Sequence, residues 1–140
     1  MRAYKTVDQF LDQWPEDSVL FTTCNSGNAQ LAANLAKSCR LNSMPLVFFA
    51  ADQDAFNQLA PLCHVVNFAG SSPHRFAISR NTRRRSIKIG KRAFHGLAWL
   101  TYGLFKCILS SGRNAVYMDT DVVVRSDFRD DLMAYFSSDK

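Results

Sequence analysis

The residues from Asn114 to Val124 read Asn-Ala-Val-Tyr-Met-Asp-Thr-Asp-Val-Val-Val. A run of strand-forming side chains ends there at two carboxylates placed two residues apart, Asp119 and Asp121, before an apolar run resumes. Burying an unpaired carboxylate costs more free energy than an apolar core can return. We therefore expect both acids at the end of a strand, where the chain leaves a sheet and meets solvent, a cation or a ligand.

Strands and helices are expected to alternate along the first half of the chain. Short runs of apolar and β-branched residues indicate buried strands, and apolar residues spaced three and four apart indicate helices. These patterns predict strands at 18–23, 46–51 and 63–68 and helices at 29–41 and 54–59. Such alternation with short connections is typical of a parallel sheet with helices on its faces. We predict an α/β protein with a Rossmann-like, mostly parallel sheet and helices on both faces.

Helix boundaries are predicted from capping residues. Thr6 and Gln9 match the capping-box pattern at the start of a short leading helix. Asn42 is expected to end the 29–41 helix in a left-handed conformation. A long helix is predicted at 91–110, and Gly112 follows it at the position where a left-handed glycine commonly stands.

The chain is expected to form a single domain. It has 140 residues, of which 47% are hydrophobic, and this is enough for one core. We expect a leading helix in 1–17, a strand–helix unit in 18–68, a basic loop in 70–90, and the long helix, strand and paired acids in 91–128. We expect neither a signal peptide nor a membrane anchor, because no apolar run reaches the roughly 20 residues of a membrane span. The sequence therefore indicates no location.

The clustered positive charge indicates a phosphate-binding segment or a solvated loop, and the spacing of the cysteines indicates free thiols. Eight arginines and lysines lie between Arg75 and Arg92 without an acid among them, in a chain of net charge +5. Such a cluster can contact phosphates of a nucleotide or a nucleic acid, or form a solvated loop. The four cysteines contain no Cys-x-x-Cys pair, so we expect free thiols in or near the core.

The paired acids have a defined chemistry at the edge of a sheet. Two carboxylates on one backbone turn can hold a hard divalent cation, which in turn neutralises a diphosphate. In parallel sheets ligands bind outside the carboxyl ends of the strands. Thr23, Asn25 and Asp52 follow the first two predicted strands, so we expect them at the same edge as Asp119 and Asp121.

The segment 116–124, after a long helix and a glycine, resembles the DxD region of glycosyltransferases with the GT-A fold, and the nucleotide-diphospho-sugar transferases in particular. Residues 19–25 resemble the family's first strand, which ends in Thr and Asn. Asn34 in the next helix and Asp52 after the second strand also agree with that family. The resemblance extends roughly over 18–128. It implies that the chain corresponds to the N-terminal, donor-binding half of such an enzyme, with an incomplete GT-A sheet.

The resemblance also implies roles for individual residues. Thr23 and Asn25 would line the nucleoside pocket, and Asp52 would approach the base or ribose. Asp119 would face the ribose or a metal-bound water, and Asp121 would ligate Mn²⁺ or Mg²⁺ on the diphosphate.

The implied donor is a nucleoside-diphosphate sugar, with a UDP-sugar favoured, and the implied acceptor is a glycan or a protein. The basic residues 80–85 would reach the diphosphate. Members of this family often work in the Golgi and the secretory pathway. Their second half supplies the acceptor site and a further metal ligand, so turnover by the isolated chain stays open.

Two other interpretations remain. The segment 119–123 also resembles the first motif of haloacid-dehalogenase-type phosphatases, in which Asp119 would be the nucleophile and Asp121 the acid/base. That motif normally lies on the first strand, with a lysine and further acids well downstream. A nucleic-acid binder would use the arginines at 83–85, but the basic stretch offers no aromatic platform for bases, so nucleic acid is not the expected partner.

Overall fold

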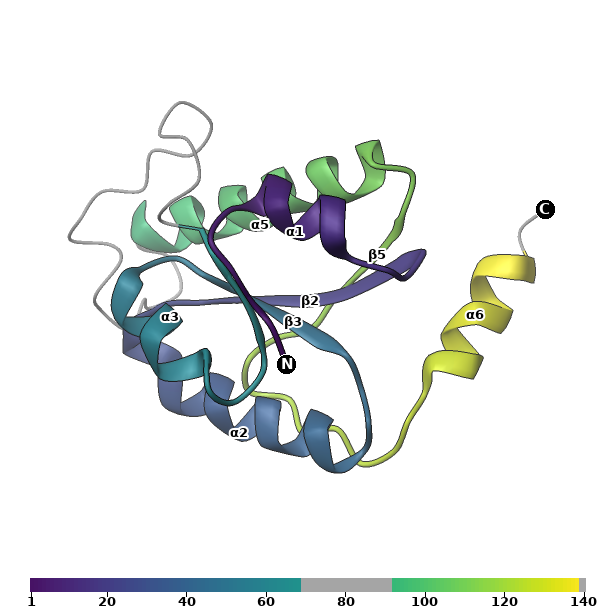
Figure 1. Cartoon of the computed structure of the whole chain (residues 1–140), viewed down its shortest axis with the longest axis horizontal. Helices are drawn as coiled ribbons and strands as arrows, with labels where there is room; N and C mark the ends of the chain where they lie inside the picture. Colours follow the sequence, from purple (N-terminus) through teal and green to yellow (C-terminus); the bar gives the residue numbers. More distant parts are fainter. Residues whose placement is uncertain (69–91, 139–140) are drawn as a thin grey trace.

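Five parallel strands form one sheet in the order β1-β4-β3-β2-β5 (Figure 1). The computed structural model describes residues 1–68 and 92–138, with the backbone alone for 92–97 and 138. The strands are β1 (Ala3–Tyr4), β2 (Ser18–Cys24), β3 (Leu46–Ala50), β4 (His64–Asn67) and β5 (Asn114–Tyr117). The predicted α/β class with a Rossmann-like sheet is confirmed, and in the described residues the sheet is parallel throughout.

Helices cover both faces of this sheet, as predicted (Figure 1). They are α1 (Val7–Gln13), the 3₁₀ turn η1 (Ser26–Asn28), α2 (Ala29–Leu41), α3 (Gln53–Leu59), α5 (Arg92–Ser110) and α6 (Arg129–Ser138). The helices α1 and α5 lie on one face, and α2 and α3 lie on the other. Because side chains alternate along each strand, one sheet supplies two separate cores.

The core under α1 and α5 is rich in aromatic rings. Phe49 of β3 is fully buried, and its ring contacts those of Phe10 and Phe21 edge to face, with centroids 5.5 and 5.7 Å away. The core under α2 and α3 contains smaller side chains, among them the buried Cys24, Cys39 and Cys63. All four cysteines are free thiols, as the sequence indicated.

The edge strand β1 was not predicted. It is two residues long and pairs with β4 through Ala3↔Val65 and Tyr4↔Val66. Two residues are too short for a periodic pattern to be visible in the sequence. The buried side chain of Tyr4 packs edge to face on Phe10 of α1 and holds this segment in place.

The caps confirm two of the predicted helix boundaries and correct one. Thr6 Oγ1 accepts a hydrogen bond from the backbone N–H of Gln9 at the start of α1. Gly112 has a φ of +80° after α5, as expected. The prediction for Asn42 was wrong, because the left-handed residue after α2 is Ser43, with a φ of +56°. The side-chain amide of Asn42 instead donates a hydrogen bond to the carbonyl oxygen of Val124.

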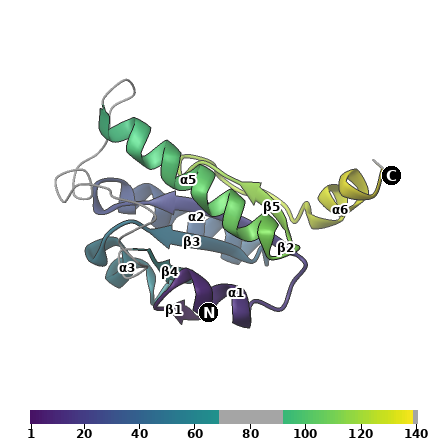
Figure 2. The ribbon, with the colours of Figure 1, turned by 90° about the horizontal axis from the view of Figure 1, so that it is seen from above.

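The last helix, α6, lies beyond the ends of the strands where β2 begins (Figure 2). Ser18 at the start of β2 donates a hydrogen bond to the sulfur of Met133, at 3.7 Å. A small, mainly apolar pocket between Leu20 and Phe136 lies at this junction. The helix therefore contacts the body of the protein on the side opposite the carboxyl ends of the strands.

Replacing Phe49 with alanine is expected to lower the free energy of unfolding by about 3–5 kcal/mol, because it removes a ring enclosed on all sides. Urea denaturation followed by circular dichroism measures the change. Leu41→Ala is the matched control, because that side chain is 76% exposed and its loss should cost less than about 0.5 kcal/mol. Equal losses for the two variants would contradict this description of the core.

Candidate functional site at the carboxyl ends of the strands

The order of the strands reverses between β2 and β5. From β2 the chain moves outward to β3 and then β4, and it returns through α5 to the opposite side of β2. Ligands of open α/β sheets bind in the crevice at such a reversal, outside the carboxyl ends of the strands. The register pairs Phe21 with Tyr117, so its continuation places Thr23 level with Asp119. Both predicted groups of site residues therefore lie at the same edge of the sheet, where the order of the strands reverses.

The loop after β2 is held by a reciprocal pair of hydrogen bonds. Asn25 Oδ1 accepts from the backbone N–H of Asn28 at 3.2 Å, and Asn28 Oδ1 accepts from the N–H of Asn25 at 2.8 Å. Asn25 is 2% exposed, and its side-chain oxygen closes this turn. The other end of the Asn28 amide, Nδ2, donates to Thr120 Oγ1 at 3.4 Å. This contact joins the loop after β2 to the middle residue of Asp119-Thr120-Asp121.

Asp52 ties two loops of the candidate site together. Its Oδ1 accepts from the N–H of Ala55 and caps α3, while Oδ2 accepts from the N–H of Ser26, both at 2.8 Å. The side chain is 6% exposed. Both carboxylate oxygens are thus already bound to the backbone, and the geometry makes Asp52 a positioning residue for the loop that carries Asn28. Its expected contact with a base or ribose stays a prediction.

Thr23 lies in a cluster of hydroxyl groups beneath α5. Its Oγ1 is 3.2 Å from Thr101 Oγ1 of α5 and 3.4 Å from the hydroxyl of Tyr117 of β5. Burial raises the pKa of Tyr117, and the nearby negative charge of Asp119 raises it further. Thr23 is almost completely buried, and these contacts hold α5 and the strands β2 and β5 together at this edge of the sheet.

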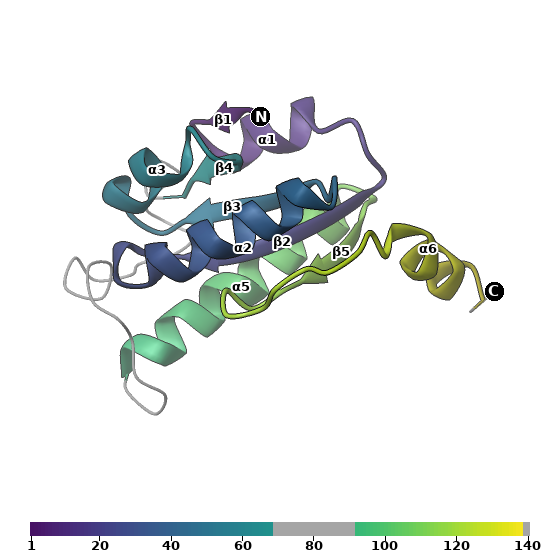
Figure 3. The ribbon, with the colours of Figure 1, turned by 90° about the horizontal axis from the view of Figure 1, so that it is seen from below.

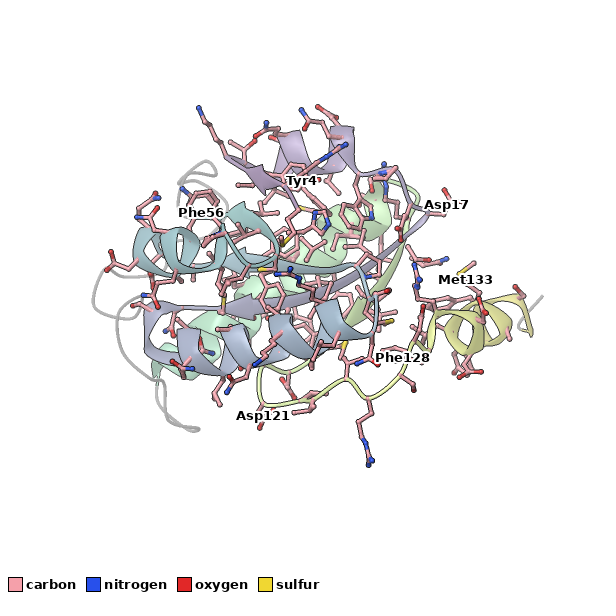
Figure 4. The ribbon with its side chains drawn as sticks, turned by 60° about the horizontal axis from the view of Figure 1, so that its bottom comes forward. Tyr4, Asp17, Phe56, Asp121, Phe128 and Met133 are labelled. Carbon is pink, nitrogen blue, oxygen red and sulfur yellow. The ribbon has the colours of Figure 1, made fainter. Side chains whose placement is uncertain are left out.

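The two acids themselves stand at the surface. The N–H of Val122 donates to the carbonyl oxygen of Asp119 at 3.3 Å and closes a turn over 119–122. The side chains of Asp119 and Asp121 are exposed, and Figure 4 shows Asp121 at the outside of this loop. Within residues 1–68 and 92–138 no cluster of three or more histidines, cysteines or acids could hold a metal ion. Two carboxylates therefore provide part of a hard-cation site, and a ligand and water would have to supply the other oxygens.

The chain after the acids runs back along α2 as an extended strap, residues 122–128 (Figure 3). The N–H of Val124 donates to Ser38 Oγ at 3.1 Å, and its carbonyl accepts from Asn42 Nδ2 at 3.0 Å. Val124 is 5% exposed and joins the core under α2. The strap therefore fixes the position of the turn over 119–122 from its carboxyl side.

Asn28, Thr120 and Tyr117 were missed as members of this site. Asn28 was visible only as part of a turn rich in cap-forming residues, and its link to Thr120 spans 92 positions of the sequence. No local pattern reports such a contact. The basic residues expected to reach a diphosphate, at 80–85, lie outside the described residues.

Comparisons with protein-family models, curated proteins and solved structures found no match to this chain. Its class rests on its own topology: it is an α/β protein with a Rossmann-like parallel sheet, in which the order of the strands reverses between β2 and β5. None of the described helices combines the length and the apolar character needed to cross a bilayer.

Asp52→Ala is expected to lower the free energy of unfolding by about 2 kcal/mol. The variant loses a helix cap worth about 1 kcal/mol and leaves the N–H of Ser26 without its acceptor, a loss of similar size. Urea denaturation measures this change. Asp8→Ala, in the exposed first turn of α1, is the control and should cost no more than about 0.3–1 kcal/mol through the helix dipole. If Asp52→Ala costs no more than the control, Asp52 does not tie the loops together.

Proposed function

We propose that the crevice between β2 and β5 binds a nucleoside-diphosphate sugar through a divalent cation, as the donor site of a glycosyltransferase. The observation that carries this proposal is the contact between Asn28 and Thr120, which brings the loop after β2 against Asp119-Thr120-Asp121 at the reversal of strand order. A nucleotide site and a pair of metal-ligating oxygens are then adjacent.

The cation would be Mn²⁺ or Mg²⁺, held by Asp121 with Asp119 beside it. Carboxylate oxygens suit such hard cations, and the exposed turn leaves several coordination positions to diphosphate oxygens and water. A cation in that position offsets the repulsion between two carboxylates and a diphosphate, and it stabilises the charge that develops on a departing diphosphate. We therefore expect metal and nucleotide to bind together.

The loop after β2 would receive the nucleotide. Asn25 and Asn28 fix its shape, and Asp52 holds it against α3. The first turn of α2, which follows this loop, contains no acidic residue. The partial positive charge at the start of a helix attracts phosphate, so α2 favours an anion at the same edge. Transfer of the sugar to a glycan or protein acceptor would require further groups around the reacting carbon.

Isothermal titration calorimetry of the protein with UDP and with GDP, each with and without Mn²⁺, tests the proposal. We expect binding of a nucleoside diphosphate that depends on the metal, with UDP favoured. A folded sample that binds neither nucleotide in the presence of Mn²⁺ would sink the proposal. Formation of a beryllofluoride adduct on Asp119 would instead support the haloacid-dehalogenase-type interpretation, in which Asp119 is the nucleophile that accepts a phosphoryl group.

Asp121→Asn, studied in the same titration, distinguishes loss of metal binding from loss of folding. Removing the charged ligand should weaken nucleotide binding in Mn²⁺ at least tenfold, which corresponds to about 1.4 kcal/mol, and leave the free energy of unfolding unchanged. Asp130→Asn, an equal charge change at an exposed position in the first turn of α6, is the matched control and should bind as the unmodified protein does.

A further inference from the structure

A pocket lies where α6 meets the amino end of β2, at the opposite end of the strands from the paired acids. Figure 4 shows Asp17 and Met133 on the two sides of this junction. The pocket has a volume of about 200 Å³, and its wall is formed by the segment before β2, by the first residues of β2 and by α6. Sites for drug-sized ligands are larger, roughly 300–1,000 Å³, so this pocket suits a small molecule.

Most of the wall is apolar and continues the core under α2. Leu20 of β2 is 4% exposed and belongs to that core, and Leu132 of α6 packs against it. Met133 and Phe136 of α6 complete the apolar part. Ser18 donates its hydrogen bond to the sulfur of Met133 and so joins the two sides of the pocket. Because apolar surface gains free energy on leaving water, this part favours a ligand with an apolar stem.

The polar part of the wall has an excess of negative charge. Glu16 and Asp17 contribute two carboxylates, and neither forms a salt bridge within the part of the chain that the structure describes. Arg129 also lines the pocket, but its guanidinium donates three hydrogen bonds to the carboxylate of Asp127, at 2.6–3.1 Å. These bonds raise the pKa of Arg129, and the charge of Glu16 adds a smaller contribution. The charge of Arg129 is therefore already paired, and two carboxylates remain for a ligand.

A second arginine stands nearby without lining the pocket. Arg113 donates hydrogen bonds to the backbone carbonyl oxygens of Trp14 and Glu16, at 3.1 and 3.3 Å, so its guanidinium is bound by its own chain. Even with Arg113 included, the carboxylates of Glu16, Asp17 and Asp127 outnumber the two arginines. The pocket is thus apolar with a net negative charge, a combination that is complementary to a cation on an apolar stem.

We propose that this pocket binds a small aliphatic amine in its protonated form. The apolar stem lies against the side chains of α6, and the ammonium group lies at Glu16 and Asp17. An ammonium group donates three hydrogen bonds and accepts none, and its bonds to carboxylates are stronger than those between neutral groups. The small volume holds one short stem rather than a stretch of peptide. Because this pocket and the turn over 119–122 lie at opposite ends of the strands, the assignment does not rest on nucleotide binding.

Titration of the whole chain with n-pentylamine, followed by the NMR signals of backbone amides at neutral pH and low salt, tests the proposal. Amides of residues 16–20 and 129–136 are expected to shift together and to saturate in the millimolar range, because so small a ligand makes few contacts. The neutral n-pentanol should bind at least about threefold more weakly. Pentanoate should cause no saturable shift, because the carboxylates of the pocket repel it. Shifts centred instead on the exposed acids at 119–121, or equal binding of amine and alcohol, would overturn the proposal.

Glu16→Gln removes one charge of the pocket with little change of shape. It should weaken binding of n-pentylamine at least about threefold and leave binding of n-pentanol unchanged. Asp12→Asn is the matched control, since it makes the same charge change at an exposed position of α1 outside the pocket. It should bind the amine as the unmodified protein does. Equal effects of the two substitutions on the amine would contradict the assignment.

A last titration distinguishes a free amine from a lysine side chain of a partner protein. Nα-acetyl-lysine methylamide presents a comparable cationic stem attached to a peptide backbone. It is expected to bind more weakly than n-pentylamine, because α6 and the segment before β2 bound the pocket and leave little room for a backbone. Tighter binding of the lysine derivative would overturn the proposal of a free amine and assign the pocket to a partner's lysine.

Discussion

The parallel pairing of β5 with β2 is the constraint on which the candidate site depends. Its register, with Phe21 opposite Tyr117, sets where the chain leaves the sheet and therefore where the two acids stand. A shift of one residue would turn every side chain of β5 to the other face. Tyr117 would then leave the aromatic core under α5, and the acids would lose their place beside the loop after β2. The same pairing that fills the core thus places the acids beside the loop after β2.

Much of the architecture could be predicted from the sequence, because it rests on local periodicity. Burial imposes a visible spacing of apolar residues on the strands at 18–23 and 46–51 and on the helix at 29–41. The short connections between them imply a parallel sheet. The clustering of strand-end polar residues followed from that topology. The left-handed residue after α2 was predicted to be Asn42, whereas it is Ser43. The side chain of Asn42 donates a hydrogen bond to the carbonyl oxygen of Val124, and a contact between such distant residues leaves no local pattern in the sequence.

The internal chemistry of the site could not be predicted in the same way. The sequence shows that Asp52 follows a strand, but not that both of its oxygens are bound to backbone N–H groups. Likewise Thr23 is a strand-end hydroxyl in the sequence and a buried contact of α5 in the fold. These buried residues hold the loops at this edge of the sheet in place, whereas the side chains of Asp119 and Asp121 are exposed. In the proposed site, the buried residues would position the loops and the exposed acids would contact the ligand.

The central claim is that a metal–nucleotide complex binds between the loop after β2 and the turn over 119–122. Paramagnetic broadening of backbone amide signals by Mn²⁺ in the presence of UDP tests it most directly, with Mg²⁺ as the diamagnetic reference. The proposal predicts that signals of residues 26–29 and 119–122 broaden together, while those of β4 and α6 stay sharp. Broadening centred on the acids at the start of α6, Asp130 and Asp131, or absent from the loop after β2, would contradict it.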